Sequence, residues 1–188
     1  GIIDYIKFKT STIPMFTSST FHGNVKIEDE NVEWVVAWLT NSETSFIETY
    51  CNTVPTPLGG SHELGFRHAL TKGIRNFADI KGFKKANEII YDDLINSTGS
   101  ILSIFIKNPQ FQGQTKEKLV SLSSAKLVEI AIKDRFETWL SNDLSIGEAI
   151  LNRTIDNYED RKRKKKEKDI FRKTITKKIR LPGKLADC

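Results

Sequence analysis

The feature that most limits what this chain can fold into is a dense run of charge near its carboxyl end. Residues 161–180 contain twelve Lys or Arg against Glu167 and Asp169, which gives the run a net charge of +10. A solvated helix face is the usual structural explanation of such a run. With 38% hydrophobic residues among 188, the chain is long enough for one substantial core. We therefore expect one compact domain followed by a helical extension.

Charge and cysteine usage narrow the class of protein. The whole chain carries a formal net charge of +5, so the residues outside the run sum to −5 and the positive field is local. The two cysteines, Cys51 and Cys188, stand at no short metal-ligand spacing from His22, His62 or His68. No apolar run approaches the roughly 20 residues that cross a bilayer. We expect a cytoplasmic protein without a disulfide framework, a structural metal or a membrane segment.

Hydrophobic patterning predicts a helix and three strands in the first third of the chain. Isoleucines at near-helical spacing predict a short helix over residues 1–9. Aromatic and β-branched residues over 20–26 and 32–40, separated by a polar turn, predict a β-hairpin. Side chains over residues 45–53 alternate between two faces and predict a third strand.

The remainder of the chain is predicted to be mainly helical. Ser61 is a good N-cap for a helix that follows a glycine pair. The apolar face of residues 101–107 predicts a fourth, buried strand, which leads into a loop over 108–123. A helix is predicted over 124–140, and residues 145–148 fit the capping box of another.

These elements predict an α/β fold of the α+β sandwich type. About four strands form a mixed, mostly antiparallel sheet with helices on one face. We divide the chain into a domain over residues 1–141, a basic helical extension over 142–180 and a short tail over 181–188.

The loop after the fourth strand is the first candidate site. Its residues 108–116 include Gln114, Thr115 and Lys116, whose side chains can all donate hydrogen bonds to a terminal phosphate. The spacing Gly-x-x-Lys lacks the glycines and helix of a P-loop. An ordinary polar loop is therefore the alternative interpretation.

The glycine pair before Ser61 is the second candidate. Gly59 and Gly60 permit close backbone approach, and amides at the start of a helix favour an anion, with Arg67 one turn on. Neighbouring Ser, His and Glu side chains on one turn point apart, so they do not form a catalytic triad. The alternative is a strand-to-helix turn that needs glycine.

The basic run is the third candidate. It could follow a phosphate backbone and bind it in a salt-dependent manner. Phe171 is its one aromatic residue, which argues against stacking on single strands. The alternative is a solvated helix face.

Four motifs in this order resemble a known family. They are YCNT at 50–53, PLGGSHELGFR at 57–67, QFQGQTKEKL at 110–119 and LPGKLADC at 181–188. Together they are similar to successive signatures of the ATPase (B) subunits of bacterial type IIA DNA topoisomerases, which comprise gyrase and topoisomerase IV. The segments 32–38 and 177–180 look more like the topoisomerase IV branch.

The resemblance implies a transducer domain, a fold also seen in a ribosomal protein, with a left-handed βαβ crossover. It would lie between a GHKL-type ATP-binding domain and a Toprim domain, with residues 181–188 beginning the linker to the latter. Lys116 would then contact the γ-phosphate of ATP, with Gln114 beside it, and Arg67 would meet DNA phosphates. The further DNA-binding candidates lie in the basic run: Arg161, Lys162, Arg163, Lys164 and Lys165.

The resemblance also implies the partners and the activity of the full-length protein. It would bind ATP and Mg²⁺ and, as a homodimer, pair with the topoisomerase A subunits in an A2B2 heterotetramer. That assembly would relax and decatenate duplex DNA, whereas this segment alone would bind no cofactor and have no catalytic residue. Two alternatives remain: a stand-alone nucleic-acid-binding module that uses the basic helix, and a pure assembly domain.

Overall fold

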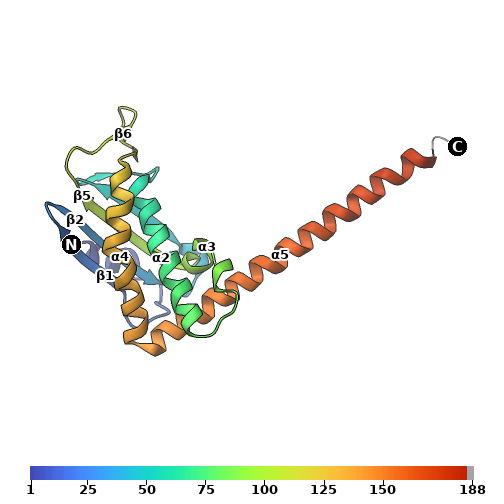
Figure 1. The fold of residues 1–188 in the computed structure, drawn as a ribbon, viewed down its shortest axis with the longest axis horizontal. Helices are drawn as coiled ribbons and strands as arrows, with labels where there is room; N and C mark the ends of the chain where they lie inside the picture. Colours follow the sequence, from blue (N-terminus) through green and yellow to red (C-terminus); the bar gives the residue numbers. More distant parts are fainter. Residues whose placement is uncertain (186–188) are drawn as a thin grey trace.

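The computed structural model describes the backbone of residues 1–185 and the side chains of residues 1–179. It shows a body built on a β-sheet, from which one long helix projects (Figure 1). The helices are α1 (Ile2–Lys9), α2 (Ser61–Ile80), α3 (Tyr91–Ile95), α4 (Leu122–Asn142) and α5 (Leu144–Leu185), with 3-10 turns η1 (Ser42–Thr44) and η2 (Ala86–Glu88). The strands are β1 (Phe21–Ile27), β2 (Glu30–Trp38), β3 (Phe46–Cys51), β4 (Val54–Pro55), β5 (Thr98–Phe105), β6 (Phe111–Gln112) and β7 (Lys118–Leu119).

The main sheet is mixed and has five strands in the order β1-β2-β5-β3-β4. The pairs β1–β2, β2–β5 and β3–β4 are antiparallel, whereas β3 and β5 are parallel. The expected fold class is therefore confirmed, with the two-residue β4 added to the four predicted strands. The handedness of the crossover from β3 to β5 stays a prediction.

Strand β5 lies in the middle of the sheet, and both of its faces are buried. Leu102 and Ile104 belong to the main core together with residues of α2 and α4, while Ile101 joins a smaller core on the opposite face. Thr98, Ser100 and Ser103 are buried along the same strand, so β5 is not a continuous apolar run. Its apolar residues were recognised from one face only.

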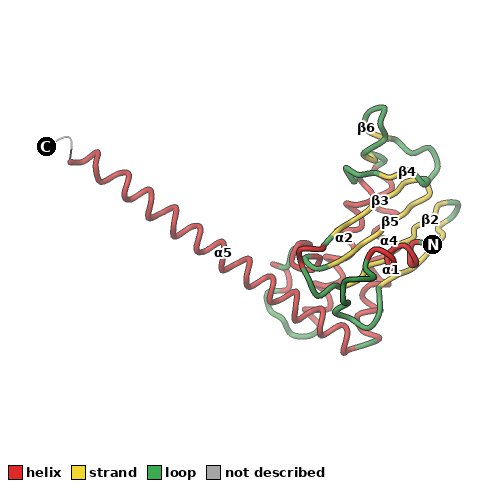
Figure 2. The backbone as a smooth tube through the Cα atoms, turned by 180° about the vertical axis from the view of Figure 1, so that it is seen from behind, coloured by secondary structure: helices red, strands yellow, loops and turns green. Residues whose placement is uncertain are grey.

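The second face of the sheet is partly covered by α1, as the view from behind shows (Figure 2). Ile6 of α1 packs with Val35, Ala37 and Leu39 of the β2 segment, all of them almost completely buried. The expectation that helices cover only one face of the sheet is wrong for this reason. Ile2 and Ile6 of α1 would otherwise face water.

Helices α2 and α4 pack tightly against each other on the main face of the sheet (Figure 1). Gly65 and Gly73 face α4: a Cβ on Gly65 would stand 2.1 Å from the carbonyl oxygen of Ala125, and one on Gly73 would stand 2.6 Å from Phe136 Cδ1. The absence of these two side chains is therefore what allows the helices to approach so closely.

Helix α5 begins on the body and then leaves it. Its start is capped by Asp143, whose side chain accepts a hydrogen bond of 3.2 Å from the amide of Ile146. The capping box predicted at 145–148 is therefore wrong, and so is the N-cap at Ser61, since Gly60 occupies that position before α2. Ile146, Ile150 and Tyr158 are buried against the body, whereas residues 162–179 are all exposed.

Candidate functional site

The predicted loop over 108–123 contains a small hairpin. Strands β6 and β7 pair through Phe111 with Leu119 and through Gln112 with Lys118, which leaves residues 113–117 at the tip. Gln114 and Lys116 are both exposed there, and Lys116 adopts a left-handed backbone with φ of 57°. Among the described residues Lys116 forms no ion pair, so its ammonium group is free to meet an anion.

The base of this hairpin is joined to the start of α2. The amide of Leu119 donates to the carbonyl of Gly59 at 3.1 Å, and the amide of Leu58 donates to the carbonyl of Glu117 at 3.0 Å. A Cβ on Gly60 would stand 2.1 Å from the carbonyl oxygen of Leu119. The glycine pair is thus required where β7 crosses the first turn of α2, which agrees with its interpretation as a strand-to-helix turn.

The same junction reaches α4 through two hydrogen bonds that involve serine hydroxyl groups. Ser61 Oγ lies 2.7 Å from Ser124 Oγ, and Ser121 Oγ accepts a hydrogen bond of 2.8 Å from the amide of Gln110. The hairpin is consequently fixed to the first turns of both α2 and α4. A displacement of its tip has a short, hydrogen-bonded route to the two main helices of the body.

His62, in the same turn, faces inward. Its Nε2 lies 3.0 Å from Thr56 Oγ1, which in turn lies 2.6 Å from Thr49 Oγ1 in β3. The His62 side chain is fully buried, and burial lowers its pKa to about 4. It is therefore a neutral group that joins α2 to the sheet, and it is out of reach of an anion at the surface.

Arg67 lies one turn further along α2 and is already paired. Its Nε and Nη2 donate to Glu63 Oε1 at 2.9 and 2.7 Å, and its guanidinium lies 4.5 Å from the ring centroid of Tyr91. The side chain remains 41% exposed. The pair holds the guanidinium at the surface in a fixed orientation, and contact with DNA stays a prediction.

The basic residues predicted to bind DNA differ in their surroundings. Arg161 binds Asp93, Lys162 pairs with Glu88 at 3.0 Å, and Arg163 pairs with Asp160 on its own helix at 2.7 Å. Lys164 and Lys165 are exposed and have no ion-pair partner among the described side chains. The role of each in DNA binding stays a prediction.

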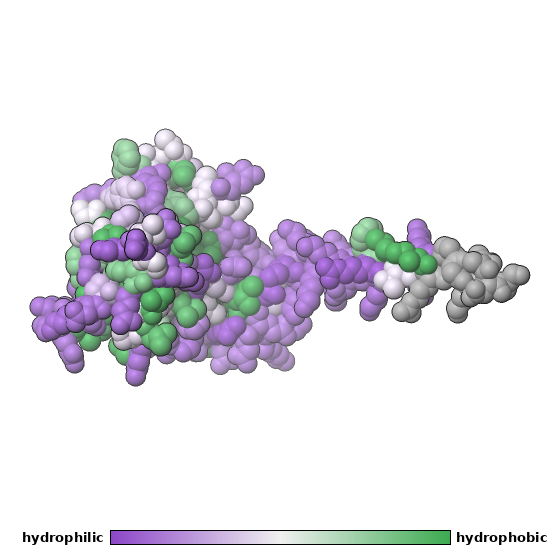
Figure 3. Space-filling view, turned by 90° about the horizontal axis from the view of Figure 1, so that it is seen from above, coloured by the Kyte–Doolittle hydropathy of each residue, from purple (hydrophilic) through white to green (hydrophobic). Residues whose placement is uncertain are grey.

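The projecting part of α5 is mainly hydrophilic, with a hydrophobic patch toward its far end (Figure 3). The exposed apolar residues there are Ile170, Phe171, Ile175 and Ile179. The basic run of the sequence continues to Arg180, but the side chains of 180–188, including the last predicted motif, lie outside the described residues.

Asp93, next to which Arg161 lies, is a site residue that sequence reasoning missed. It is 3% exposed, and its Oδ2 accepts the amide of Ile90 at 2.9 Å, which caps the short helix α3. The only local signal was an acidic residue in the first turn of a helix. Its partner is distant in the sequence and could not be identified without the fold.

The described part of the chain offers neither a metal site nor a membrane segment. No group of three His, Cys, Asp or Glu there could hold a metal ion. No described helix is both long and apolar enough to cross a membrane.

Comparison with known proteins places the chain in a family. The model of the family described as DNA gyrase B matches residues 1–170. The B subunits of DNA topoisomerase 4 from Caulobacter vibrioides and Rickettsia bellii are 42% and 45% identical to this chain over its whole length. The chain spans 28% and 29% of the length of these relatives.

Solved structures agree. The topoisomerase IV ATP-binding domain of Francisella tularensis, in complex with a small-molecule inhibitor, has a TM-score of 0.71 at 26% identity, over 84% of this chain and 42% of that one. The 43K ATPase domain of Thermus thermophilus gyrase B, in complex with an aminocoumarin, has a TM-score of 0.78 at 22% identity, over 90% of this chain and 46% of that one, and so shares its fold. With its motifs, its sheet and its family match in agreement, this chain belongs to the DNA gyrase B family.

Proposed function

We propose that this chain is the transducer segment of the B subunit of an ATP-dependent type II DNA topoisomerase. In this proposal Lys116 and Gln114 contact the γ-phosphate of ATP held by a preceding domain of the same protein. The names of the relatives support topoisomerase IV rather than gyrase. The match of the whole chain to part of longer proteins favours this function over a stand-alone nucleic-acid-binding module.

The observation that carries the proposal is the attachment of the β6–β7 hairpin. Its tip presents Lys116 to the surface. Its base is hydrogen-bonded to Gly59 and Ser61 at the start of α2, and the flanking Gln110 is hydrogen-bonded to Ser121 at the start of α4. A lysine ammonium is a mobile point charge with three donors, which suits a terminal phosphate. The residues present therefore fit a γ-phosphate contact, whereas the remainder of the nucleotide site and the Mg²⁺ site would lie in other domains.

The proposed coupling follows from the chemistry of that contact. A γ-phosphate is present in ATP and absent from ADP, so the position of the hairpin differs before and after hydrolysis. Helices α2 and α4 pack together and α5 packs on the end of the body, so the shift can reach α5. Coupling of this kind requires a contact that differs between the ATP-bound and ADP-bound states. In this proposal the contact of Lys116 with the γ-phosphate is that difference.

DNA is the second proposed ligand. The Arg67 side chain on α2 is 41% exposed and is paired with Glu63. Lys164 and Lys165 are exposed on α5 without ion-pair partners among the described side chains. These cations would meet phosphates of the transported duplex, and Arg161, Lys162 and Arg163 remain further candidates. We propose that the full-length protein works as a homodimer with two topoisomerase A subunits, in an A2B2 heterotetramer that relaxes and decatenates DNA in the cytoplasm.

Substitution of Lys116 tests the proposal. In the full-length protein Lys116→Ala should lower the ATP turnover rate by roughly 100-fold, the usual cost of removing one donor that stabilises developing charge. The free energy of unfolding should change by less than about 0.5 kcal/mol, because an exposed side chain is removed. Both are measured on purified variants, by steady-state ATP hydrolysis and by urea unfolding.

Lys118→Ala is the matched control, since Lys118 is exposed two residues away in the same hairpin. It should retain wild-type ATP turnover. Equal turnover in the wild type and Lys116→Ala would remove this lysine from the mechanism, and equal losses in both variants would indicate a general effect of charge.

A further inference from the structure

The last contacts between α5 and the body are made by one short stretch of the helix. Asn157 Nδ2 donates to the carbonyl of Asp93 at 2.9 Å, Tyr158 donates to the carboxylate of Glu88, and Lys162 pairs with the same carboxylate. Beyond Lys162, every residue up to 179 is exposed. We call these contacts between residues 157–162 and residues 88–93 the α3–α5 joint.

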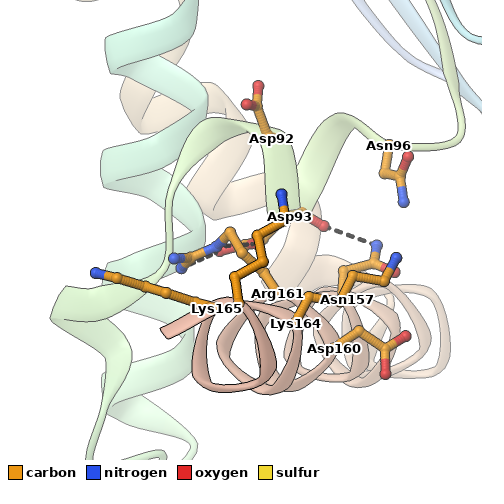
Figure 4. A pocket seen from close by; sticks show the side chains of 9 residues that line it. Asp92, Asp93, Asn96, Asn157, Asp160, Arg161, Lys164 and Lys165 are labelled. Atoms are coloured by element: carbon orange, nitrogen blue, oxygen red, sulfur yellow. Dashed lines mark hydrogen bonds and ion pairs between the residues drawn. The ribbon is translucent and has the colours of Figure 1, made fainter. Parts of the chain in front are cut away.

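Arg161 lies at the centre of the joint (Figure 4). Its Nε donates to Asp93 Oδ1 at 2.9 Å, and its Nη2 donates to Asp93 Oδ2 at 3.0 Å and to the carbonyl of Glu88 at 3.0 Å. The guanidinium thereby holds both oxygens of one carboxylate and a backbone carbonyl. A planar fork of donors fixes direction as well as distance, which a single ammonium cannot do.

The Asp93 side chain is only 2% exposed, and the Arg161 guanidinium is the cation that pairs with it. A buried carboxylate without a cation is costly, and the amide of Ile90 supplies the remaining hydrogen bond. The same carboxylate therefore caps α3 and holds α5. The hydrogen bond to Asp93 also raises the pKa of Arg161 above its ordinary value, so the guanidinium stays charged.

The joint sets the direction of a long projection. Residues 163–185 continue α5 for about 35 Å, given the rise of about 1.5 Å per residue in an α-helix. A tilt of about 10° at the joint would displace the far end by about 6 Å. Small changes at residues 88–93 are therefore amplified along the helix.

We propose that Arg161 is a positioning residue, which sets the direction of α5 by clamping Asp93 and the Glu88 carbonyl and so couples movement of the body to the projecting helix. The functional consequence of this inference, the coupling of ATP hydrolysis to strand passage, rests on the proposed function. The clamp itself is independent of nucleotide and DNA. It gives Arg161 a role other than the binding of DNA phosphates.

A distance measurement on this chain tests the clamp directly. Spin labels are attached to cysteines introduced at two exposed positions, Ser123→Cys in α4 and Thr176→Cys in α5, in a chain that also carries Cys188→Ser. The distance between the labels, measured by pulsed electron paramagnetic resonance, reports the direction of α5. We expect one narrow distance distribution for the wild type. Arg161→Gln, Arg161→Lys and Asp93→Asn should each broaden or shift it, because none of them preserves the full fork. Circular dichroism confirms that each variant is folded.

Arg163→Gln is the matched control. This substitution removes the same charge from the same helix, but the partner of Arg163 is Asp160, which lies on α5 itself. It should leave the distance distribution unchanged. Arg161→Lys separates the two roles, because it keeps a cation for a phosphate and loses the bidentate clamp.

The consequence is tested in the full-length protein assembled with the topoisomerase A subunit. Arg161→Lys and Asp93→Asn should retain ATP turnover while the number of strand passages per ATP falls by about twofold to thirtyfold, the range for positions that modulate coupling. Lys26→Gln, which removes a charge from an exposed position of β1 away from the joint, should keep the wild-type ratio. Absence of ATP-driven strand passage in the wild type would overturn the proposed function and leave the distance result standing.

Two results would overturn the clamp. One is an unchanged distance distribution in both Arg161→Gln and Asp93→Asn. The other is a wild-type distance distribution in Arg161→Lys, together with equal changes of that distribution in Arg161→Gln and Arg163→Gln. This result would show that Arg161 acts through its charge alone.

Discussion

At the scale of single residues, burial decides what a side chain can do. His62 and Arg67 come from one motif and one helix, yet His62 is enclosed between α2 and the sheet while Arg67 stays at the surface. The histidine has one ring nitrogen bound to Thr56, and its Nδ1 has no hydrogen-bond partner among the described residues. Such a group is stable only while it is neutral.

Acid should therefore destabilise this protein through His62. Burial lowers the pKa of His62 from 6.5 to about 4 in the folded state. Below pH 6.5 the unfolded chain binds a proton that the folded chain does not, so stability present above 6.5 is lost as the pH falls toward 4. Between pH 7 and pH 5 the expected loss is about 2 kcal/mol. Urea unfolding at the two pH values measures it.

His62→Gln serves as the comparison, since glutamine keeps polar atoms and does not titrate. It should reduce the difference in stability between pH 7 and pH 5, even if its stability at pH 7 is lower. The same pH dependence in both proteins would assign the acid sensitivity to other groups.

At the scale of secondary-structure elements, close approach of α2 and α4 unites the site. The hairpin that carries Lys116 is attached at its base to the starts of both helices. Further along, Lys72 and Asn76 of α2 contact Glu129 and Glu137 of α4. Movement at the hairpin is transmitted only if the two helices move together. Gly65 is the residue that brings their backbones closest near the hairpin.

Gly65→Ala should lower the free energy of unfolding by about 1–3 kcal/mol, the usual cost of overpacking. In a helix without this contact, the same change would add about 1 kcal/mol of stability through propensity. The sign is reversed here because the new Cβ would meet the Ala125 carbonyl oxygen, which belongs to the backbone and cannot rotate away. His68→Ala, on the exposed side of α2, should change stability by less than about 0.5 kcal/mol. A stabilised Gly65→Ala variant in urea unfolding would contradict the close packing.

At the scale of the whole molecule, charge is divided between the body and the projecting helix. Residues 161–180 carry a net charge of +10, whereas the remainder of the chain carries a net charge of −5. Three of the basic residues nearest the body form ion pairs, whereas Lys164 and Lys165 do not among the described side chains. An anionic partner would therefore first meet the helix beyond the α3–α5 joint.

Duplex DNA binding by this chain should depend on these two lysines. The logarithm of the affinity falls linearly with the logarithm of the salt concentration, and each phosphate contact that is lost makes this slope less steep by about 0.9. The double substitution Lys164→Gln with Lys165→Gln should reduce that slope by about 2, measured by fluorescence anisotropy at several salt concentrations. Lys7→Gln with Lys26→Gln removes the same charge from exposed positions of α1 and β1. Equal effects of the two double variants would assign binding to net charge rather than to α5.

Much of the fold could be predicted because its signals are local. The aromatic and β-branched residues of β1 and β2, the alternation in β3 and the apolar face of β5 identified all four long strands, and helical spacing identified α2 and α4. The predicted N-cap at Ser61 is wrong because the preceding Gly60 is fitted to Leu119, which is distant in the sequence. The position of α1 on the second face was missed because periodicity shows which residues are buried and not against what.

The sequence by itself determined the family, the four long strands, the charged projection and the position of the cation-bearing loop, because each of these depends on residues close together in the chain. Only the tertiary structure decided which side chains meet: that the hairpin of Lys116 is bound to α2 and α4, that His62 faces the sheet, and that Arg161 clamps Asp93. The physical reason is that ion pairs and hydrogen bonds act over a few ångströms. Partners far apart along the chain come within that range only after the β3–β5 crossover and the helix packing have formed.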